Sequence, residues 1–547
     1  MTIEEAGEIA PSLAVTHIDT AASARELITQ MMLEPSGQVG PSVYETARVV
    51  TVAPWLTGHD RRLRYLLDTQ RSDGGWGQPE GYALVPTLSA TEAIVQTLRS
   101  IDADPPHGVG ENDLTGAARR GLQALFDWLQ TGALSLPDTP AIDVLVPALV
   151  SSINELLRPD SDTPIRGLTA WWSGRRLGLP PGMNGKRLAA ARQLTAEGKM
   201  PAKLVHFLEV LAYGEQGAPG VRPAPPGAVG ASPAATAAWL GPAASGSTGP
   251  AREFLDDVIA LQGGPVPCPF PIRAFERSWV LSTLARADVP FAVPSALLDD
   301  LAATVEPIGV AAGAGLPADA DTSSVTLYAL AKLGRPIAPD SLFAFETPAG
   351  FCTWPGEDGF SVTTNAHVLD AFGQFVITTA DASPRYREVL DKLSATLSGE
   401  QRADGSWHDR WHASPYYATA CCAVALDESG RGPAAREAVA RAVDWVLRTQ
   451  RTDGSWGRWS GTTEETAYAM QVLLATGNPA RRAVNEAVRQ GYAFLSEALG
   501  AQPDPPLWYG KELYLPKAIV RAAAVAALHL TQAGPDSAAT GDIAARR

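Results

Sequence analysis

The amino-acid sequence predicts an all-α fold, and three observations carry that prediction. Apolar residues recur at helical spacing along the 547-residue chain, whereas alternating strand-like runs are scarce. The 50 Gly and 44 Pro residues are abundant enough to end many short helices. One seven-residue pattern also occurs three times. Together these features favour layers of helical hairpins.

The clearest helical segments follow one another along the chain. In each of them, apolar side chains stand three or four residues apart, so they would form one buried face of a helix. These segments are residues 90–98, 204–211, 327–333 and 368–372.

The repeated pattern is Gln-x-x-Asp-Gly-x-Trp, at residues 70–76, 401–407 and 450–456. Asp-Gly forms a turn that needs a positive φ, the Gln amide can bond backbone groups at a helix end, and the Trp ring can cover the next helix. We therefore expect each copy to clamp neighbouring helices together and to make no contact with a substrate.

A change of composition divides the chain. Residues 216–250 are rich in Ala, Pro and Gly, which predicts a domain boundary near residue 245. We expect an N-terminal segment (1–35) that stands alone or packs on the second domain, a first domain (36–244), a second domain (245–533) and a mobile tail (534–547).

The charge and cysteine content exclude several classes of protein. The 44 Lys plus Arg against 59 Asp plus Glu give a net charge of −15, which argues against a nucleic-acid partner or an anionic membrane surface. Four Cys residues suit neither a disulfide framework nor a zinc site. The acidic N-terminus does not resemble a signal peptide, and no apolar run is long enough for stable membrane insertion. We expect a cytoplasmic protein.

At this point the motifs resemble a known family. The three repeats are similar to the QW motifs of class II terpene cyclases, and LPADADTSSVTLYALAKLG (316–334) resembles their Asp-x-Asp-Asp-Thr acid motif with its helix. Other segments between residues 40 and 520 resemble diterpene cyclases that make copalyl-type diphosphates. They include SVYETARVV, MPAKLVHFLEVL, AFERSWVLSTL, NAHVLDAF, WHASPYYAT, EETAY and WYGKELYLP.

The resemblance implies two α-barrel domains, called γ and β, with the active cavity between them. The γ barrel would be the first domain and the β barrel the second. The chain has no Asp-Asp-x-x-Asp motif, so ionisation of a diphosphate is not the expected start of the reaction.

Asp321 is the expected catalytic acid, and Asp319 is its expected neighbour. Protonating an alkene needs a carboxylic acid that is neutral at rest and strong when it donates. Burial and the Asp319 carboxylate would keep Asp321 protonated, while the helix start and a polar donor would stabilise the carboxylate that forms. An Asp before Thr-Ser and an apolar helix also fits an ordinary N-cap. Thr322 replaces the third Asp of the commoner pattern but leaves the acid intact.

The resemblance suggests partners for the acid and for the final base. Asn365 is the first choice as the donor to Asp321, and His367 is the second. His206 matches a histidine that, in plant copalyl diphosphate synthases, helps to hold the water acting as terminal base. The partner Asn of that histidine falls on Cys268 here. Because a thiol is a poor replacement for an amide that orients a water molecule, the final deprotonation can differ in this protein.

Carbocations in a dry cavity are stabilised by the faces of aromatic rings, which do not trap the charge as a nucleophile would. Aromatic residues at helical spacing are also common in ordinary cores. The candidates for the cavity wall are Trp354, Trp411, Tyr416, Tyr417 and Tyr468.

A diphosphate carried through the reaction needs cations. Lys511 and Lys203 are the candidates from this chain, although most Lys residues are solvated surface groups. Mg²⁺ usually bridges phosphate oxygens with few protein ligands, and Glu80 is a candidate to hold it.

The leading hypothesis is a class II cyclase that protonates a linear prenyl diphosphate and retains the diphosphate. Geranylgeranyl diphosphate, giving a bicyclic labdane or halimane type, is the first choice of substrate, and farnesyl diphosphate, giving drimenyl diphosphate, is the second. A downstream class I synthase or phosphatase would then use the product. The alternatives are a squalene-type triterpene cyclase and a non-catalytic, isoprenoid-binding toroid.

Overall fold

The structure is a computed structural model that describes residues 18–101, 105–132, 134–158, 165–242, 248–476, 481–501 and 504–537. Its described elements are helices apart from two small hairpins, β1 (Val310–Ala311) with β2 (Ala318–Asp319) and β3 (Trp508–Tyr509) with β4 (Leu513–Tyr514). Both hairpins are antiparallel, and they pair Val310 with Asp319 and Trp508 with Tyr514. The all-α prediction is confirmed.

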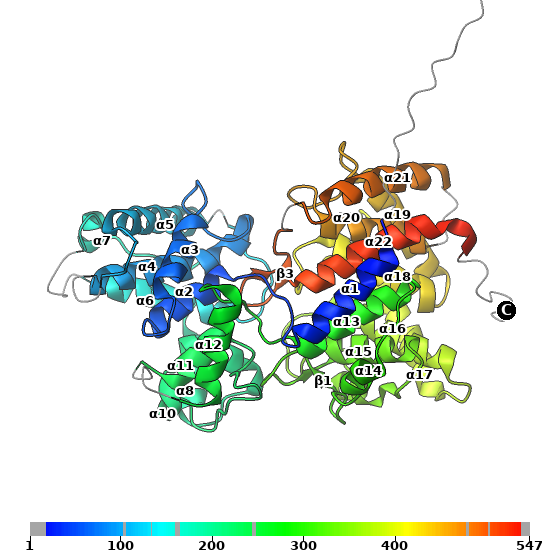
Figure 1. The fold of residues 1–547 in the computed structure, drawn as a ribbon, viewed down its shortest axis with the longest axis horizontal. Helices are drawn as coiled ribbons and strands as arrows, with labels where there is room; N and C mark the ends of the chain where they lie inside the picture. The colour runs from blue at the N-terminus through cyan, green and yellow to red at the C-terminus, as the bar shows by residue number, and fades with distance from the viewer. Residues whose placement is uncertain are drawn as a thin grey trace, which may run out of the picture.

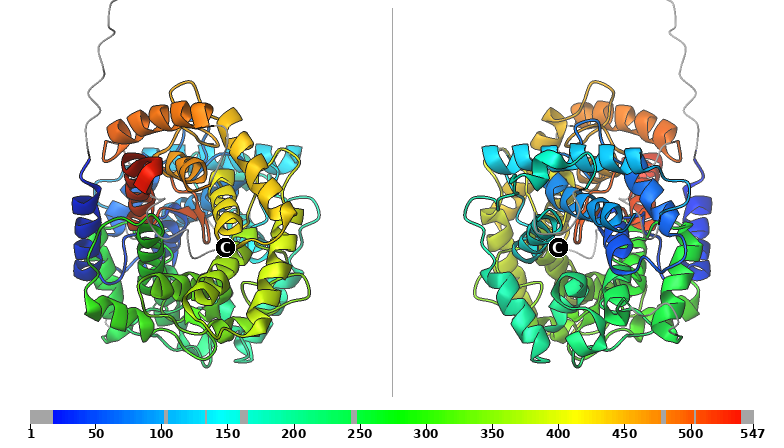
Figure 2. Two further views of the ribbon diagram at one scale, coloured as in Figure 1. Left: turned by 90° about the vertical axis from the view of Figure 1, so that its right-hand side faces the viewer. Right: turned by 90° about the vertical axis from the view of Figure 1, so that its left-hand side faces the viewer.

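The helices form two lobes that lie side by side (Figure 1). In the larger lobe, six inner helices contact one another in a closed ring, and Figure 2 shows this ring end on. The inner helices, in ring order, are α13 (Arg273–Arg286), α15 (Ala320–Lys332), α16 (Val362–Thr378), α18 (Pro415–Ser429), α20 (Thr463–Ala475) and α22 (Lys517–Ser537).

A second layer of helices covers this ring from outside. Each outer helix contacts an inner helix next to it in the chain, except α1, which packs against α22 at the other end of the sequence. The outer elements are α1 (Thr20–Leu33), α14 (Ser295–Ala302), η4 (Pro339–Phe345), α17 (Pro384–Gly399), α19 (Pro433–Arg448) and α21 (Arg481–Ala498).

The smaller lobe repeats the design with five inner helices. They are α2 (Val43–Val52), α4 (Leu84–Ser100), α6 (Ile142–Leu156), α9 (Leu208–Leu211) and α11 (Pro233–Leu240), each in contact with the next and α11 with α2. Its other elements are α3 (His59–Asp68), η1 (Glu80–Ala83), α5 (Glu111–Thr131), α7 (Thr169–Trp172), α8 (Lys186–Ala196), η2 (Ala202–Phe207), α10 (Gly214–Gly217) and α12 (Pro250–Gln262).

The chain crosses between the lobes later than the sequence suggests. We expected the boundary near residue 245, but α12 still packs against α11 of the smaller lobe. At the other end, α22 continues through Ser537, and the rest of the expected mobile tail lies outside the described residues.

Side-chain caps and prolines explain where many of these helices begin. The Ser42, Ser361 and Thr462 hydroxyls accept hydrogen bonds from backbone N–H groups in the first turns of α2, α16 and α20. Pro stands in the first turn of α17, α18 and α19, where its missing N–H has no cost. The inner helices α15, α18 and α20 are buried on nearly all sides because they pack against other helices of the ring and against the outer layer.

The three repeats are clamps between helices, as predicted. Gln450 donates from its amide to the carbonyl oxygens of Gly454 (3.0 Å) and Ala487 (2.9 Å), and Trp456 donates from its indole to Val446 (2.8 Å). Gly454 has a φ of 84°, which a side chain would oppose. The repeats that begin at Gln70 and Gln401 make the same bonds.

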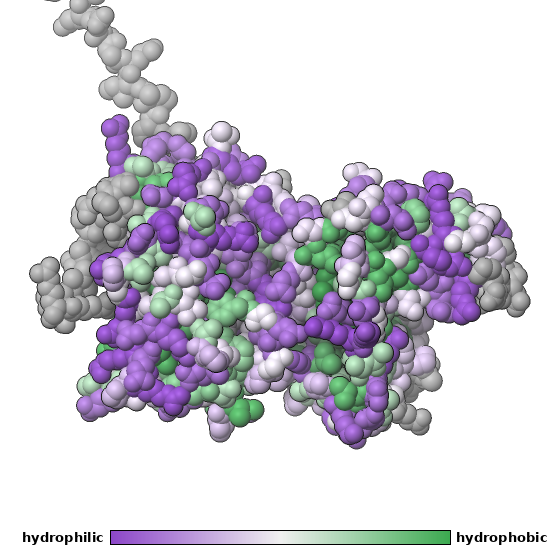
Figure 3. Space-filling model, turned by 180° about the vertical axis from the view of Figure 1, so that it is seen from behind, coloured by the Kyte–Doolittle hydropathy of each residue, from purple (hydrophilic) through white to green (hydrophobic). Residues whose placement is uncertain are grey.

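One buried apolar cluster runs from the larger lobe into α2, α11 and α12, so the lobes share a continuous packed surface. Polar residues cover most of the face opposite to that of Figure 1, and apolar residues gather in one area of the lobe at right in Figure 3. Within the described parts of the chain, no helix combines the length and the hydropathy needed to cross a bilayer.

Candidate active site

A cavity of about 720 Å³ lies between the two lobes. The smaller lobe contributes residues from segments 137–144, 187–194 and 203–207, and the larger lobe contributes residues from 312–322 and 353–363 among others. Both Asp319 and Asp321 line this cavity. The acid motif therefore lies where the family resemblance implies the active cavity.

The local fold of the acid motif fixes its two carboxyl groups. Asp319 ends β2 and caps α15, because its carboxyl accepts hydrogen bonds from the N–H (2.6 Å) and the hydroxyl (3.0 Å) of Thr322. Asp321 stands in the first turn of α15, where the unpaired N–H groups of a helix start favour negative charge. The N-cap interpretation thus applies to Asp319 and leaves Asp321 free to face the cavity.

His367 is the partner of Asp321. Its Nδ1 lies 2.7 Å from Oδ1 of Asp321, and the two side chains are about 10% and 15% exposed. Burial lowers the pKa of His367, but the charge and the hydrogen bond of Asp321, together with Cys421, outweigh burial, so the pKa of His367 is raised well above its usual value. An imidazolium against Asp321 stabilises the carboxylate that remains after a proton has left.

Asn365, our first choice as the donor, is not at the acid. Its amide donates to the carbonyl oxygens of Phe351 (2.9 Å) and Ser361 (2.7 Å) and accepts from the N–H of Phe351 (2.8 Å). Residues 365 and 367 are two apart on α16, so their side chains point to different faces. Asn365 therefore holds the segment before α16 in place, and that expectation was wrong.

Asp319 is the more deeply buried of the two carboxyl groups. Burial raises the pKa of its carboxyl to about 8, the hydrogen bonds from Thr322 oppose that rise, and the charge of Asp321 adds to it. Asp319 therefore binds a proton more tightly than an exposed Asp does.

Aromatic rings extend from His367 along the cavity. Trp279 packs edge-on to His367 at 5.5 Å and donates from its indole to the hydroxyl of Tyr417 at 3.1 Å. The rings of Tyr417 and Trp508 lie 4.7 Å apart, and both line the cavity. One ring thus comes from each of four elements, which are helices α13, α16 and α18 and hairpin β3–β4.

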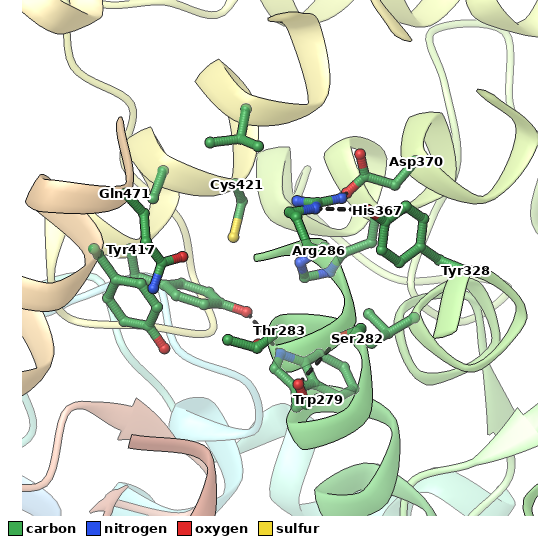
Figure 4. Close-up of a pocket in the computed structure, with 14 residues that line it drawn as sticks. Trp279, Ser282, Thr283, Arg286, Tyr328, His367, Asp370, Tyr417, Cys421 and Gln471 are labelled. Atoms are coloured by element: carbon green, nitrogen blue, oxygen red, sulfur yellow. Dashed lines mark hydrogen bonds and ion pairs between the residues drawn. The ribbon is translucent and has the colours of Figure 1, made fainter. Parts of the chain in front are cut away.

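The expected wall residues divide into two groups. Trp354, Trp411 and Tyr417 line the large cavity. Tyr416 packs against Trp445 at 4.7 Å within the core and does not line it. Tyr468 lines a smaller cavity behind His367, which Figure 4 shows together with Arg286, Asp370 and Cys421.

His206 and Cys268 lie together, as their motif positions suggest. His206 lines the cavity, and its Nδ1 is 2.6 Å from the carbonyl oxygen of Gly230, so Nδ1 carries the hydrogen. Its Nε2 then carries a lone pair that faces the Cys268 thiol, with Sγ 3.7 Å away. Burial, with a further contribution from the charge of Lys511, lowers the pKa of His206 to about 4. A neutral imidazole with this lone pair can accept a proton.

Lys511 does not lie in the cavity wall, contrary to our expectation. Its ammonium group is buried and contacts Glu45 (3.0 Å), Glu209 (2.9 Å) and the hydroxyl of Ser232 (2.8 Å). A cation held by two buried carboxyl groups is not available to a diphosphate. Lys511 is instead a link between the β3–β4 hairpin of the larger lobe and α2, α9 and α11 of the smaller one.

The mouth of the cavity carries the available cations. Lys203 lines it and donates to the carbonyl oxygen of Gly356 (3.2 Å), while Arg187 lies 3.0 Å from both Asp143 and Asp358. Neither of these basic side chains is buried. Of the two lysines expected to meet a diphosphate, the structure brings only Lys203 to the cavity.

Glu80 is not suited to hold Mg²⁺ at the cavity. Its carboxylate accepts from Arg458 (2.5 Å) and from the indole of Trp459 (2.9 Å), and it does not line the cavity. Over the described ranges, no three His, Cys, Asp or Glu side chains gather into a metal site. Any Mg²⁺ would therefore depend on one or two carboxylates and on the oxygens of the substrate.

Sequence reasoning missed several residues of this site. Arg187, Asp143 and Asp358 stand in loops or helices without a recognisable spacing, so no pattern marked them. Trp508 lies within WYGKELYLP, whose lysine was the expected ligand of the diphosphate. The motif's aromatic residues were the available signal, and the structure places Trp508 in a hairpin that reaches the cavity.

Comparisons with known proteins agree with this geometry. The family description "Squalene-hopene cyclase C-terminal domain" matches residues 357–508. An ent-copalyl diphosphate synthase of a Streptomyces species is 40% identical over 519 residues, which is 93% of this chain and 96% of the relative. A labda-7,13-dienyl diphosphate synthase of Streptomyces clavuligerus is 39% identical over 520 residues, 93% of each chain.

Among solved structures, an ent-copalyl diphosphate synthase from Streptomyces platensis superposes with a TM-score of 0.87 at 44% identity, covering 94% of this chain and all of the other. The likeness thus extends over both lobes and the cavity between them. The chain belongs to the family of bacterial class II terpene cyclases that includes the copalyl diphosphate synthases.

Proposed function

We propose that this enzyme converts geranylgeranyl diphosphate into a bicyclic labdane- or halimane-type diphosphate. The observation that carries the proposal is the pairing of Asp321 with His367 at a cavity that has aromatic walls. The side chains of Lys203 and Arg187, which also line this cavity, favour a diphosphate over a hydrocarbon such as squalene. The products named for the relatives at 39–40% identity support the same reaction class.

The reaction begins with proton transfer from the carboxyl group of Asp321 to the terminal alkene carbon. The His367 imidazolium and the start of α15 stabilise the carboxylate that this transfer leaves on Asp321. The substrate's own double bonds then attack the cation in turn and close two rings.

Loss of a proton ends the sequence and leaves the diphosphate in place, so the overall change is an isomerisation. Nε2 of His206, directly or through a water molecule, is the proposed acceptor because its tautomer leaves a lone pair facing Cys268 and the cavity. Because the diphosphate is retained, a class I synthase or a phosphatase would have to use the product.

The diphosphate is proposed to bind at the mouth, near Lys203 and Arg187. Asp143 and Asp358, which flank Arg187, are the carboxylates that would hold an Mg²⁺ ion there, and the ion would supply positive charge to the diphosphate. The cytoplasmic location stays a prediction from the sequence.

The proposed function is tested by incubating the protein with geranylgeranyl or farnesyl diphosphate and Mg²⁺, followed by dephosphorylation and product analysis. We expect a bicyclic C20 alcohol as the main product and slower turnover of the C15 substrate. Asp321→Asn should abolish cyclisation and keep the circular dichroism spectrum of the wild type. Retained turnover in that variant would contradict the assignment of the acid.

A further inference from the structure

A buried carboxylate stands behind the aromatic wall, and the proposed mechanism gives it no task. Glu464 of α20 is fully buried, and its Oε1 accepts a hydrogen bond from Nε1 of Trp508 at 2.6 Å. Nε2 of His412 lies 3.1 Å from the same oxygen, and Oε2 of Glu464 has no hydrogen-bond partner. Three motifs far apart in the sequence, WHASPYYAT, EETAY and WYGKELYLP, therefore meet at this carboxylate.

The hydrogen bonds define the charges in this cluster. Nδ1 of His412 accepts the backbone N–H of Ser414 at 3.0 Å, so the ring hydrogen is on Nε2 and is donated to Glu464. The Trp508 indole can only donate. One oxygen that accepts two N–H groups fits an ionised carboxylate beside a neutral histidine. In the described part of the chain, no Lys or Arg forms an ion pair with Glu464.

Burying a carboxylate without a neighbouring cation costs free energy of folding. The electric field of that carboxylate acts on the groups around it. Burial first, and the Glu464 charge next, raise the pKa of Tyr468 well above its usual value. Burial also raises the pKa of Tyr514, and the charges of Asp321 and Glu464 add to that rise. Tyr514 lines the large cavity, so Asp321 and Glu464 act on the same wall.

The rings between these two carboxyl groups are continuous. Trp508 lies 4.7 Å from Tyr417 and 6.2 Å from Trp279, and Trp279 lies 5.5 Å from His367, the partner of the acid. Figure 4 shows Trp279 and Tyr417 next to each other below the smaller cavity, joined by their hydrogen bond. A positive charge that moves along this wall stays within reach of Trp508.

We infer that Glu464 is a positioning residue that acts through Trp508 to stabilise the moving carbocation of the cyclisation. A carboxylate bonded to the indole N–H pushes electron density toward the ring and adds its own attraction for a cation on the far side. The ring separates the carboxylate from the cavity, so this oxygen cannot trap the cation as a nucleophile. The inference rests on the proposed cyclisation.

The test compares Glu464→Gln with the matched control Glu465→Gln. Glu465 is the next residue of α20 and equally buried, but its carboxylate is bonded by Ser414, Thr462 and the N–H of Arg458 and does not touch the wall. Glu464→Gln should lower kcat for geranylgeranyl diphosphate roughly tenfold or more and leave KM within about twofold. Glu465→Gln should leave both constants near those of the wild type.

Binding of two inert analogues separates electrostatics from packing. One is a geranylgeranyl diphosphate whose terminal double bond is saturated, so it cannot be protonated, and the other carries an ammonium nitrogen at the carbon where the first cation would form. Glu464→Gln should weaken binding of the ammonium analogue roughly tenfold and leave the neutral analogue unchanged. An equal loss for both analogues, or no loss for either, would overturn the inference.

Two further measurements keep the test decisive. If Glu464→Gln does not fold, Trp508→Phe keeps a ring but removes the N–H link, and it should weaken the ammonium analogue selectively. Equal affinity changes for both analogues in Trp508→Phe would also overturn the inference. Turnover of geranylgeranyl diphosphate by the wild type is measured in parallel. Absence of that turnover would contradict the proposed function, whereas the comparison of variants tests the role of Glu464.

Discussion

At the scale of single residues, the proposed role of Asp321 depends on its partner His367 as much as on its own position. The sequence motif was sufficient to propose Asp321 as the acid, but it left Asn365 and His367 as alternative partners because both belong to the same short motif. The choice between them depends on which face of α16 turns toward Asp321, and a short motif does not determine that orientation. In the structure, His367 faces α15 and Asn365 faces the chain segment at Phe351.

His367→Asn should lower activity and leave stability nearly unchanged, whereas Asn365→Ala should lower stability and leave activity nearly unchanged. Without the imidazolium, the Asp321 carboxylate loses its main stabilisation, so kcat should fall on the order of 100-fold with little change in unfolding. Asn365→Ala leaves the buried N–H of Phe351 unpaired and should lower the free energy of unfolding by about 1–3 kcal/mol, with kcat nearly unchanged. Steady-state kinetics and urea unfolding of both variants check this, and a large kcat loss only in Asn365→Ala would reverse the assignment.

At the scale of elements, the first turns of the helices matter both for the fold and for the proposed chemistry. The spacing of apolar residues and the three clamps predicted the helices well, because those signals are local and repeat along the chain. The same local reasoning placed a cap at the start of α15, but it could not tell which Asp was the cap. The answer lies in the turn from β2 into α15, which aims the Asp319 carboxyl at Thr322 and leaves Asp321 exposed to the cavity.

The cap of α15 makes stability depend on pH. In the folded chain burial raises the pKa of Asp319 to about 8, above its value in the unfolded chain, so the folded state binds this proton more tightly. The contribution of Asp319 to stability is therefore complete below about pH 4 and is lost as the pH rises toward 8. Urea unfolding of the wild type and of Asp319→Asn across this range should show the difference between them shrinking or reversing in favour of the variant. Parallel pH curves would contradict the raised pKa.

At the scale of the whole molecule, the cavity exists only while the two lobes hold their relative position. The sequence could show that there are two domains with an active cavity between them, but not what joins them. Lys511 shows why, because Glu45, Glu209 and Ser232 each lie more than two hundred residues away in the chain. From sequence alone, a lysine in a conspicuous motif is read as a ligand of the substrate, whereas the assembled lobes make it a buried link.

Lys511→Met and Lys203→Met should separate these two roles. Removing Lys511 leaves Glu45 and Glu209 buried without their cation, which should lower the free energy of unfolding by about 3–5 kcal/mol. Burial raises the pKa of Glu209, so that carboxyl can take up a proton and offset part of this loss. Lys203→Met removes an exposed cation at the mouth, so it should raise KM for the prenyl diphosphate several-fold and leave stability within about 0.5 kcal/mol. Urea unfolding and steady-state kinetics of both variants measure these effects, and a higher KM without destabilisation in Lys511→Met would show that the lysine meets the diphosphate after all.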